Sequence, residues 1–259
     1  MIEVENLTKL YGDFAAVTDL SFTVKPGEVM GLVGPNGAGK TTTLRCLSGI
    51  IPPSRGSLRL AGHDLRAEPT LAKQHLAWFS DEPKLFDYLT VWEHLAFTAR
   101  IYHVHDWESR GHTLLADLEM TENSVKLPGE LSRGMKQKLA LACGLLHSPR
   151  AVLFDEPLTG LDPLGIRKMK HGIKRLAADG AAIVMSSHLL HLVEEVCSHI
   201  LIVKGGRKVI HGTLDDITRT FAAAPDASLE QVFLEATSDQ PRPAPAPPPP
   251  LPSGDARGP

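Results

Sequence analysis

The sequence has 259 residues, of which 42% are hydrophobic and 22% charged, a composition typical of globular proteins that excludes a wholly disordered or fibrous chain. Its 27 Lys and Arg residues against 30 Asp and Glu residues give a formal net charge of −3. A chain of this charge has no overall positive field with which to hold a nucleic-acid backbone, so we expect no nucleic-acid partner.

The first residues, MIEVENLTKLYG, are acidic where a signal peptide is basic, and no run of about 18 apolar residues follows anywhere. We therefore expect a soluble chain. Its three cysteines, Cys46, Cys143 and Cys197, stand far apart without metal-binding or CxxC spacing, which favours a reducing compartment.

Apolar patterning predicts an α/β fold. Residues 1–27 and 57–62 alternate in polarity, as an antiparallel edge sheet does, whereas 28–33, 151–154, 182–185 and 200–203 are apolar on both faces, as buried parallel strands are. No strand signal appears in residues 81–149, which we expect to form an inserted helical subdomain. The folded domain is expected to span residues 1–237, followed by a proline-rich, disordered tail at 238–259.

The predicted strand at 28–33 runs directly into GPNGAGKT and then into a helical stretch. This is the pattern strand, GxxxxGK[ST], helix, in which glycines let backbone N–H groups converge on phosphates at a helix N-terminus. Lys40 is expected to reach the β- and γ-phosphates, Thr41 to ligate Mg²⁺ and Thr42 to bind near the α-phosphate. The residues of this predicted phosphate site are Gly34, Pro35, Asn36, Gly37, Ala38, Gly39, Lys40, Thr41 and Thr42.

Two carboxylates follow the predicted strand at 151–154, at the strand end where open α/β sheets bind ligands. We expect Asp155 to hold Mg²⁺ and Glu156 to polarise a water for in-line attack on the γ-phosphate. To this point the residues indicate a P-loop NTPase that hydrolyses Mg-ATP or Mg-GTP.

Four further segments occur in a characteristic order: a Tyr-Gly at 11–12, LSRGM at 131–135, GLDP at 160–163 and SSH at 186–188. With them, residues 1–237 resemble the ATP-binding subunit of ABC transporters. SLEQVFLEA at 228–236 is similar to the closing helix of exporters of the ABC-2 type, whose permease is a separate chain.

The resemblance implies roles for several residues. Ser132 and Gly134 would complete the ATP site of a second subunit in a head-to-tail dimer, and Asp162 would bond across that dimer. His188 would contact the γ-phosphate and hold the attacking water. Tyr11 would stack on adenine with Val17 beside it. From the residues themselves, Ser132 is a good N-cap, and Met135, Leu139, Ala142, Cys143 and Leu146 form one apolar face of the helix that follows.

The sequence departs from the family pattern at three positions. Asp81 stands where a glutamine is usual. We expect Asp81 to take over the role of that glutamine in binding the nucleotide and Mg²⁺, but it brings an extra negative charge to the site. Arg133 and Met135 replace a glycine and a glutamine, and there we expect altered affinity rather than lost function. The aromatic residues Trp78, Phe79, Phe86, Tyr88 and Trp92 would either line a groove for a permease helix or belong to the core of the insert.

The favoured function is the ATPase subunit of an ABC exporter, held by its permease at the cytoplasmic face of the membrane and working as a dimer, most simply a homodimer. The alternative is a soluble mechanical ABC ATPase of DNA repair or translation. Such proteins usually carry two cassettes, a coiled coil or zinc modules, none of which appears in the sequence.

Overall fold

The computed structural model describes residues 1–159, 162–221 and 228–237, so the expected tail at 238–259 lies outside the described residues. The strands of this part of the chain are β1 Ile2–Tyr11, β2 Phe14–Val24, β3 Val29–Val33, β4 Arg55–Leu60, β5 His63–Asp64, β6 Leu76–Phe79, β7 Ala151–Asp155, β8 Ala182–Ser186, β9 His199–Lys204 and β10 Arg207–Thr213. The α-helices are α1 Lys40–Leu47, α2 Pro69–Gln74, α3 Val91–Tyr102, α4 Trp107–Asp117, α5 Arg133–Leu145, α6 Pro163–Ala178, α7 Leu190–Val196, α8 Leu214–Phe221 and α9 Leu229–Thr237.

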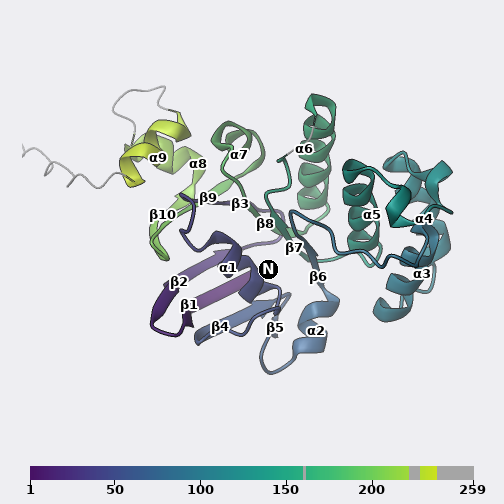
Figure 1. Cartoon of the computed structure of the whole chain (residues 1–259). Coiled ribbons are helices and arrows are strands. Elements are labelled where there is room, and N and C mark those ends of the chain that lie inside the picture. Colours follow the sequence, from purple (N-terminus) through teal and green to yellow (C-terminus); the bar gives the residue numbers. More distant parts are fainter. Residues whose placement is uncertain (160–161, 222–227, 238–259) are drawn as a thin grey trace, which may run out of the picture.

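Two sheets organise the molecule (Figure 1). The antiparallel sheet has the order β2-β1-β4-β5 and is formed by the segments whose polarity alternates. The larger sheet has the order β10-β9-β3-β8-β7-β6; all its neighbouring strands are parallel except the edge pair β9 and β10. The α/β class, the parallel core sheet and the N-terminal antiparallel sheet are therefore confirmed.

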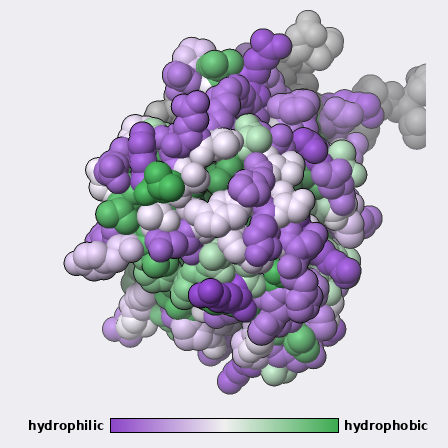
Figure 2. Space-filling model, turned by 90° about the vertical axis from the view of Figure 1, so that its right-hand side faces the viewer, coloured by the Kyte–Doolittle hydropathy of each residue, from purple (hydrophilic) through white to green (hydrophobic). Residues whose placement is uncertain are grey.

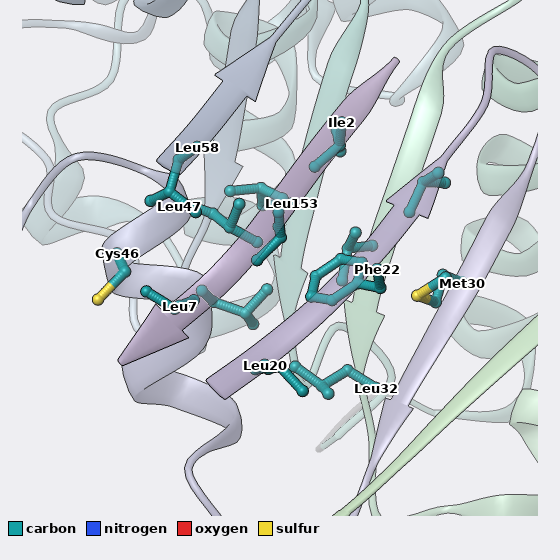
Figure 3. Packing of buried hydrophobic residues seen from close by; sticks show 14 of the residues in the cluster. Ile2, Leu7, Leu20, Phe22, Met30, Leu32, Cys46, Leu47, Leu58 and Leu153 are labelled. Carbon is teal, nitrogen blue, oxygen red and sulfur yellow. The ribbon is translucent and has the colours of Figure 1, made fainter. Parts of the chain in front are cut away.

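Hydrophobic residues join these layers in three clusters. One lies between the antiparallel sheet, α1 and one face of the larger sheet; Figure 3 shows Leu20 and Phe22 of β2 in it with Leu32 and Met30 of β3. The second covers the other face of the larger sheet with residues of α6, α7 and α9. Because both faces of β3, β7 and β8 are covered, every residue of these strands is buried.

The third cluster belongs to the helices between β6 and β7, where the structure has α3, α4 and α5, two short 3₁₀ turns and no strand. Helix α3 begins with a capping box between Thr90 and Glu93. Helix α5 is capped by Ser132, whose Oγ accepts a hydrogen bond from the N–H of Met135 at 3.3 Å, as the sequence predicts. The predicted apolar face of α5 packs into this cluster.

The five clustered aromatic residues divide between the two interpretations. Phe79 is buried and stacks on Phe154, and Trp92 packs against Trp107 inside the insert. Phe86 and Tyr88 are 53% and 92% exposed. Trp78 is partly buried against the first cluster, so three of the five belong to the core, and Phe86 and Tyr88 are the two exposed to a partner.

No helix in the described ranges combines the length and the apolar character that crossing a membrane requires.

Candidate functional site

The carboxyl ends of the parallel strands β3, β7 and β8 meet at one edge of the larger sheet, so the segments that follow them are brought together. β3 leads into the glycine-rich loop at residues 34–39, β7 ends at Asp155, and β8 ends at Ser186. This edge holds most of the sequence-predicted residues.

The glycine-rich loop is packed so closely that two of its glycines leave no room for a side chain. A Cβ at Gly34 would lie 2.3 Å from the carbonyl oxygen of Val203, and one at Gly39 would lie 2.5 Å from that of Ala16. Gly39 also adopts a φ of 98° at the N-cap of α1, a conformation that favours glycine. The loop therefore leads directly into the N-terminus of α1, whose first N–H groups have no acceptor within the helix.

Pro35, Asn36 and Gly37 form the exposed crest of the loop, whereas Ala38 is buried and its carbonyl accepts a hydrogen bond from the N–H of Gly206 at 3.1 Å. Thr42, in the first turn of α1, is half-buried. The crest is thus open to a ligand while the base of the loop is fixed to the turn between β9 and β10.

Lys40 folds back over this loop. Its Nζ donates hydrogen bonds to the carbonyl oxygens of Gly34 at 2.7 Å and Pro35 at 3.2 Å. Burial lowers the pKa of Lys40, and the nearby carboxylates of Glu156 and Asp155 oppose this shift. Phosphate oxygens would replace the two carbonyls with stronger, charged acceptors.

Asp155 lies beside the first turn of α1. It is 8% exposed, and its Oδ1 accepts hydrogen bonds from Ser186 Oγ at 2.6 Å and from Thr41 Oγ1 at 3.4 Å. A carboxylate and a hydroxyl side by side are oxygen ligands of the kind that Mg²⁺ takes together with phosphates and water.

Glu156 turns away from Asp155 toward the segment after β8. Its φ is 52°, in the left-handed region. Glu156 Oε2 accepts hydrogen bonds from the backbone N–H of His188 at 3.3 Å and from His188 Nδ1 at 2.8 Å when that nitrogen is protonated. The two residues expected to handle the attacking water are therefore in contact.

Ser186 is a residue that the sequence interpretation missed. Its buried hydroxyl donates to Asp155 Oδ1 and accepts from the backbone N–H of Glu156 at 3.0 Å, so one side chain sets the position of both acidic residues. The Ser-Ser-His motif drew attention to its histidine, but the position directly after the apolar run of β8 was a usable signal, since it is the same strand-end position that Asp155 occupies in β7.

Replacing Ser186 with alanine is expected to lower the rate of ATP hydrolysis about ten- to a hundredfold, because the N–H of Glu156 loses its acceptor and Asp155 loses a charge-assisted donor. Phosphate release measures this. The control is Ser187→Ala, which removes another buried hydroxyl, one that accepts from the N–H of Leu189. Equal rates in the two variants would contradict the positioning role of Ser186.

Of the other predicted residues, Asp81 and Val17 lie beside parts of this site, and Tyr11 lies at the end of β1. Asp81 lines a narrow pocket with Asp155 and Glu156. Tyr11 is 48% exposed at the end of β1, with Lys9 Nζ 5.1 Å from the centre of its ring, and Val17 is buried against Gly39.

Three further predicted residues lie at the N-terminal ends of two helices. Ser132 and Gly134 are exposed at the start of α5, and a Cβ at Gly134 would meet nothing within 4 Å. Asp162 caps α6 by accepting a hydrogen bond from the N–H of Gly165 at 2.6 Å. Gly160 and Leu161 of the same motif lie outside the described residues.

Comparison with known proteins identifies the family. The family model described as ABC transporter matches residues 17–159, which contain the glycine-rich loop, the start of α5 and both acidic residues. The chain belongs to the ABC transporter family. It is an ATP-binding, ATP-hydrolysing cassette of that family.

Two curated relatives and one solved structure illustrate the similarity. The ABC-type transporter ATP-binding protein EcsA of Bacillus subtilis is 33% identical over 241 residues, covering 92% of this chain and 97% of EcsA. The probable multidrug ABC transporter ATP-binding protein YbhF of Escherichia coli is 35% identical over 248 residues, and the chain spans 42% of it. A structure titled as the ATP binding subunit of an ABC transporter superposes with a TM-score of 0.87 at 34% identity, covering 92% of this chain and all of that one.

Proposed function

We propose that this cassette drives an ABC exporter by binding two Mg-ATP molecules between two head-to-tail copies, with a separate membrane permease as its partner. The observation that carries the proposal is the meeting of Lys40, Asp155 and the Glu156–His188 pair at the ends of β3, β7 and β8. One edge of the sheet thus offers a cation for phosphates, oxygen ligands for a metal and a base for water.

The donor set suits Mg²⁺. Among the described residues there is no group of three or more acidic, histidine or cysteine side chains that would enclose a metal by itself. Mg²⁺ prefers few protein ligands completed by phosphates and water, and Thr41 with Asp155 supplies this. When bound, the ion would neutralise charge that develops on the phosphates.

In the proposed mechanism, the loop N–H groups and Lys40 hold the β- and γ-phosphates, with adenine against Tyr11. Glu156 accepts a proton from the attacking water, and His188, held by Glu156, orients that water against the γ-phosphate. Ser132, Gly134 and Asp162 face solvent in a single chain, which supports their proposed use by the second copy.

The proposed permease contact is the exposed aromatic pair Phe86 and Tyr88. Phe86 rests edge-on against Phe97 of α3, which is itself 39% exposed, with Ile101 of the same helix 53% exposed. Figure 2 views the molecule from the side of α3 and α4 and shows apolar groups interrupting a hydrophilic face. Because Phe86 and Tyr88 follow Asp81 closely in the chain, an apolar surface here would connect a permease helix to the nucleotide site.

The direction of transport is proposed from α9, the closing helix of the exporter resemblance, whose Leu229 and Val232 are buried against the larger sheet. YbhF is named as a probable multidrug transporter, which is consistent with export. The proposed location is the membrane face where the permease holds the cassette.

Capture of partners tests this function. Glu156→Gln protein, isolated from its native cells in mild detergent with Mg-ATP, is expected to retain a multi-span membrane protein in stoichiometric amount, identified by mass spectrometry. Adding Tyr88→Asp, at a side chain that is 92% exposed, should remove that partner without affecting ATP binding. Recovery of ribosomes or DNA in place of a membrane protein would favour the mechanical ATPase.

A further inference from the structure

Two of the departures from the family pattern contact each other. Nη2 of Arg133 donates a hydrogen bond to Oδ1 of Asp81 at 3.3 Å, although the two residues are 52 positions apart. Asp81 lies in the segment after β6, and Arg133 is the first residue of α5, between Ser132 and Gly134. The pair therefore connects the exposed start of α5 to the segment that lines the pocket with Asp155 and Glu156.

The stability of α5 does not explain an arginine at this place. The N-terminus of a helix carries a partial positive charge, which disfavours a cation in the first turn, and α5 has no acidic residue there. Asp81 is the partner that offsets this unfavourable position.

The ion pair is also weak. It has a single N–O contact, and the side chains of Arg133 and Asp81 are 62% and 49% exposed, so water competes with both. A guanidinium binds a phosphate group through two parallel hydrogen bonds with more charge on the acceptor. A phosphate that reached Arg133 would therefore displace Asp81.

We propose that Arg133 is a phosphate-binding residue that leaves Asp81 of its own chain for the γ-phosphate of the nucleotide held by the second copy. The inference rests on the proposed head-to-tail dimer, in which Ser132 and Gly134 on either side of Arg133 face that nucleotide. In the separate chain Asp81 neutralises Arg133 and holds it away. The exchange adds a contact that favours closure of the dimer on ATP over ADP, because ADP offers no γ-phosphate.

A double-mutant cycle in the Glu156→Gln protein tests the exchange. The quantity measured is the ATP concentration that gives half-maximal dimer in analytical ultracentrifugation. Arg133→Ala should raise this concentration about tenfold, as loss of a charged hydrogen bond does. Asp81→Asn should lower it severalfold by releasing Arg133, and that gain should vanish when Arg133→Ala is also present.

A second ion pair provides the matched control. Arg175 and Asp117 are 3.9 Å apart, with side chains 69% and 57% exposed, and join α6 to α4. Arg175→Ala and Asp117→Asn should leave the half-maximal ATP concentration unchanged. Binding of ADP to the monomer should also be unchanged by Arg133→Ala.

Three outcomes would overturn the exchange. An unaltered ATP requirement in Arg133→Ala would show that Arg133 binds no phosphate. An equal increase of the half-maximal ATP concentration in Arg133→Ala and Asp81→Asn would show that the ion pair only holds two segments of one chain together. If Asp81→Asn still lowered the half-maximal ATP concentration when Arg133→Ala was also present, the effect would come from the charge of Asp81 alone. Failure of the Glu156→Gln parent to dimerise would reject the proposed function, and this inference with it.

Discussion

Glu156→Gln is expected to lower ATP hydrolysis by about two to four orders of magnitude and to accumulate an ATP-bound dimer. The amide has the shape of the carboxylate and still accepts the hydrogen bond from His188 that Oε2 accepts at 2.8 Å. It has no basicity with which to take a proton from water. Phosphate release measures the rate, and sedimentation with Mg-ATP measures the dimer.

The control for this change is Glu119→Gln. Glu119 also accepts from cations, Lys138 and Lys168, but it lies on the surface of the helical insert. Its variant should hydrolyse ATP at the wild-type rate. If Glu156→Gln matched that rate, the role of Glu156 as the base would be wrong.

Lys40→Ala is expected to weaken ATP binding about ten- to a hundredfold and to bring hydrolysis to background, because the phosphates lose their charged donor. The lysine is also the donor to the carbonyls of Gly34 and Pro35, so the loop loses two hydrogen bonds. Calorimetric titration measures the affinity, and thermal unfolding shows whether the fold is retained.

Lys73→Ala is the control that separates the loss of a phosphate donor from the loss of a hydrogen bond to a backbone carbonyl. Nζ of Lys73 donates to the carbonyl oxygen of Gly49 at 3.3 Å, so its removal also frees a backbone carbonyl, but away from the phosphate loop. Its ATP affinity should equal that of the wild type. Unchanged affinity in Lys40→Ala would exclude the lysine from phosphate binding.

In the larger sheet, the strands buried on both faces were predictable from the sequence, and the two edge strands, β6 and β10, were not. The apolar runs of β3, β7, β8 and β9 identify them without ambiguity, since each is covered by helices or by the other sheet. β6 is only four residues long, and β10 mixes Arg207, Lys208 and His211 with one buried isoleucine. β6 is buried but too short to show a pattern, and β10 is mostly exposed, so its sequence lacks an apolar run.

The same distinction applies to the site: motifs that are continuous in sequence were predictable, and contacts between distant segments were not. The glycine-rich loop and the acidic residues after β7 are continuous in sequence, and their proximity follows from the parallel sheet. The bridging role of Ser186 depends on the exact register of β7 and β8, in which Asp155 lies opposite Ser186. The contact between Asp81 and Arg133 depends on how α5 packs beside β6, which no short segment encodes.

The helical insert is attached to the large sheet at two places with different surroundings. It leaves from the carboxyl end of β6, next to Asp81, and returns at the opposite edge, where the N–H groups of Arg150 and Ala151 bond the carbonyl of His75. Tilting the insert about this second, firmly bonded attachment would swing Ser132 and Asp81 across the mouth of the site. Asp155 and Glu156, fixed to β8 through Ser186, would stay in place. In the proposed complex with a permease, a tilt caused by contact at α3 would therefore move Ser132 and Asp81 relative to the bound phosphates while the acidic residues of β7 stay fixed.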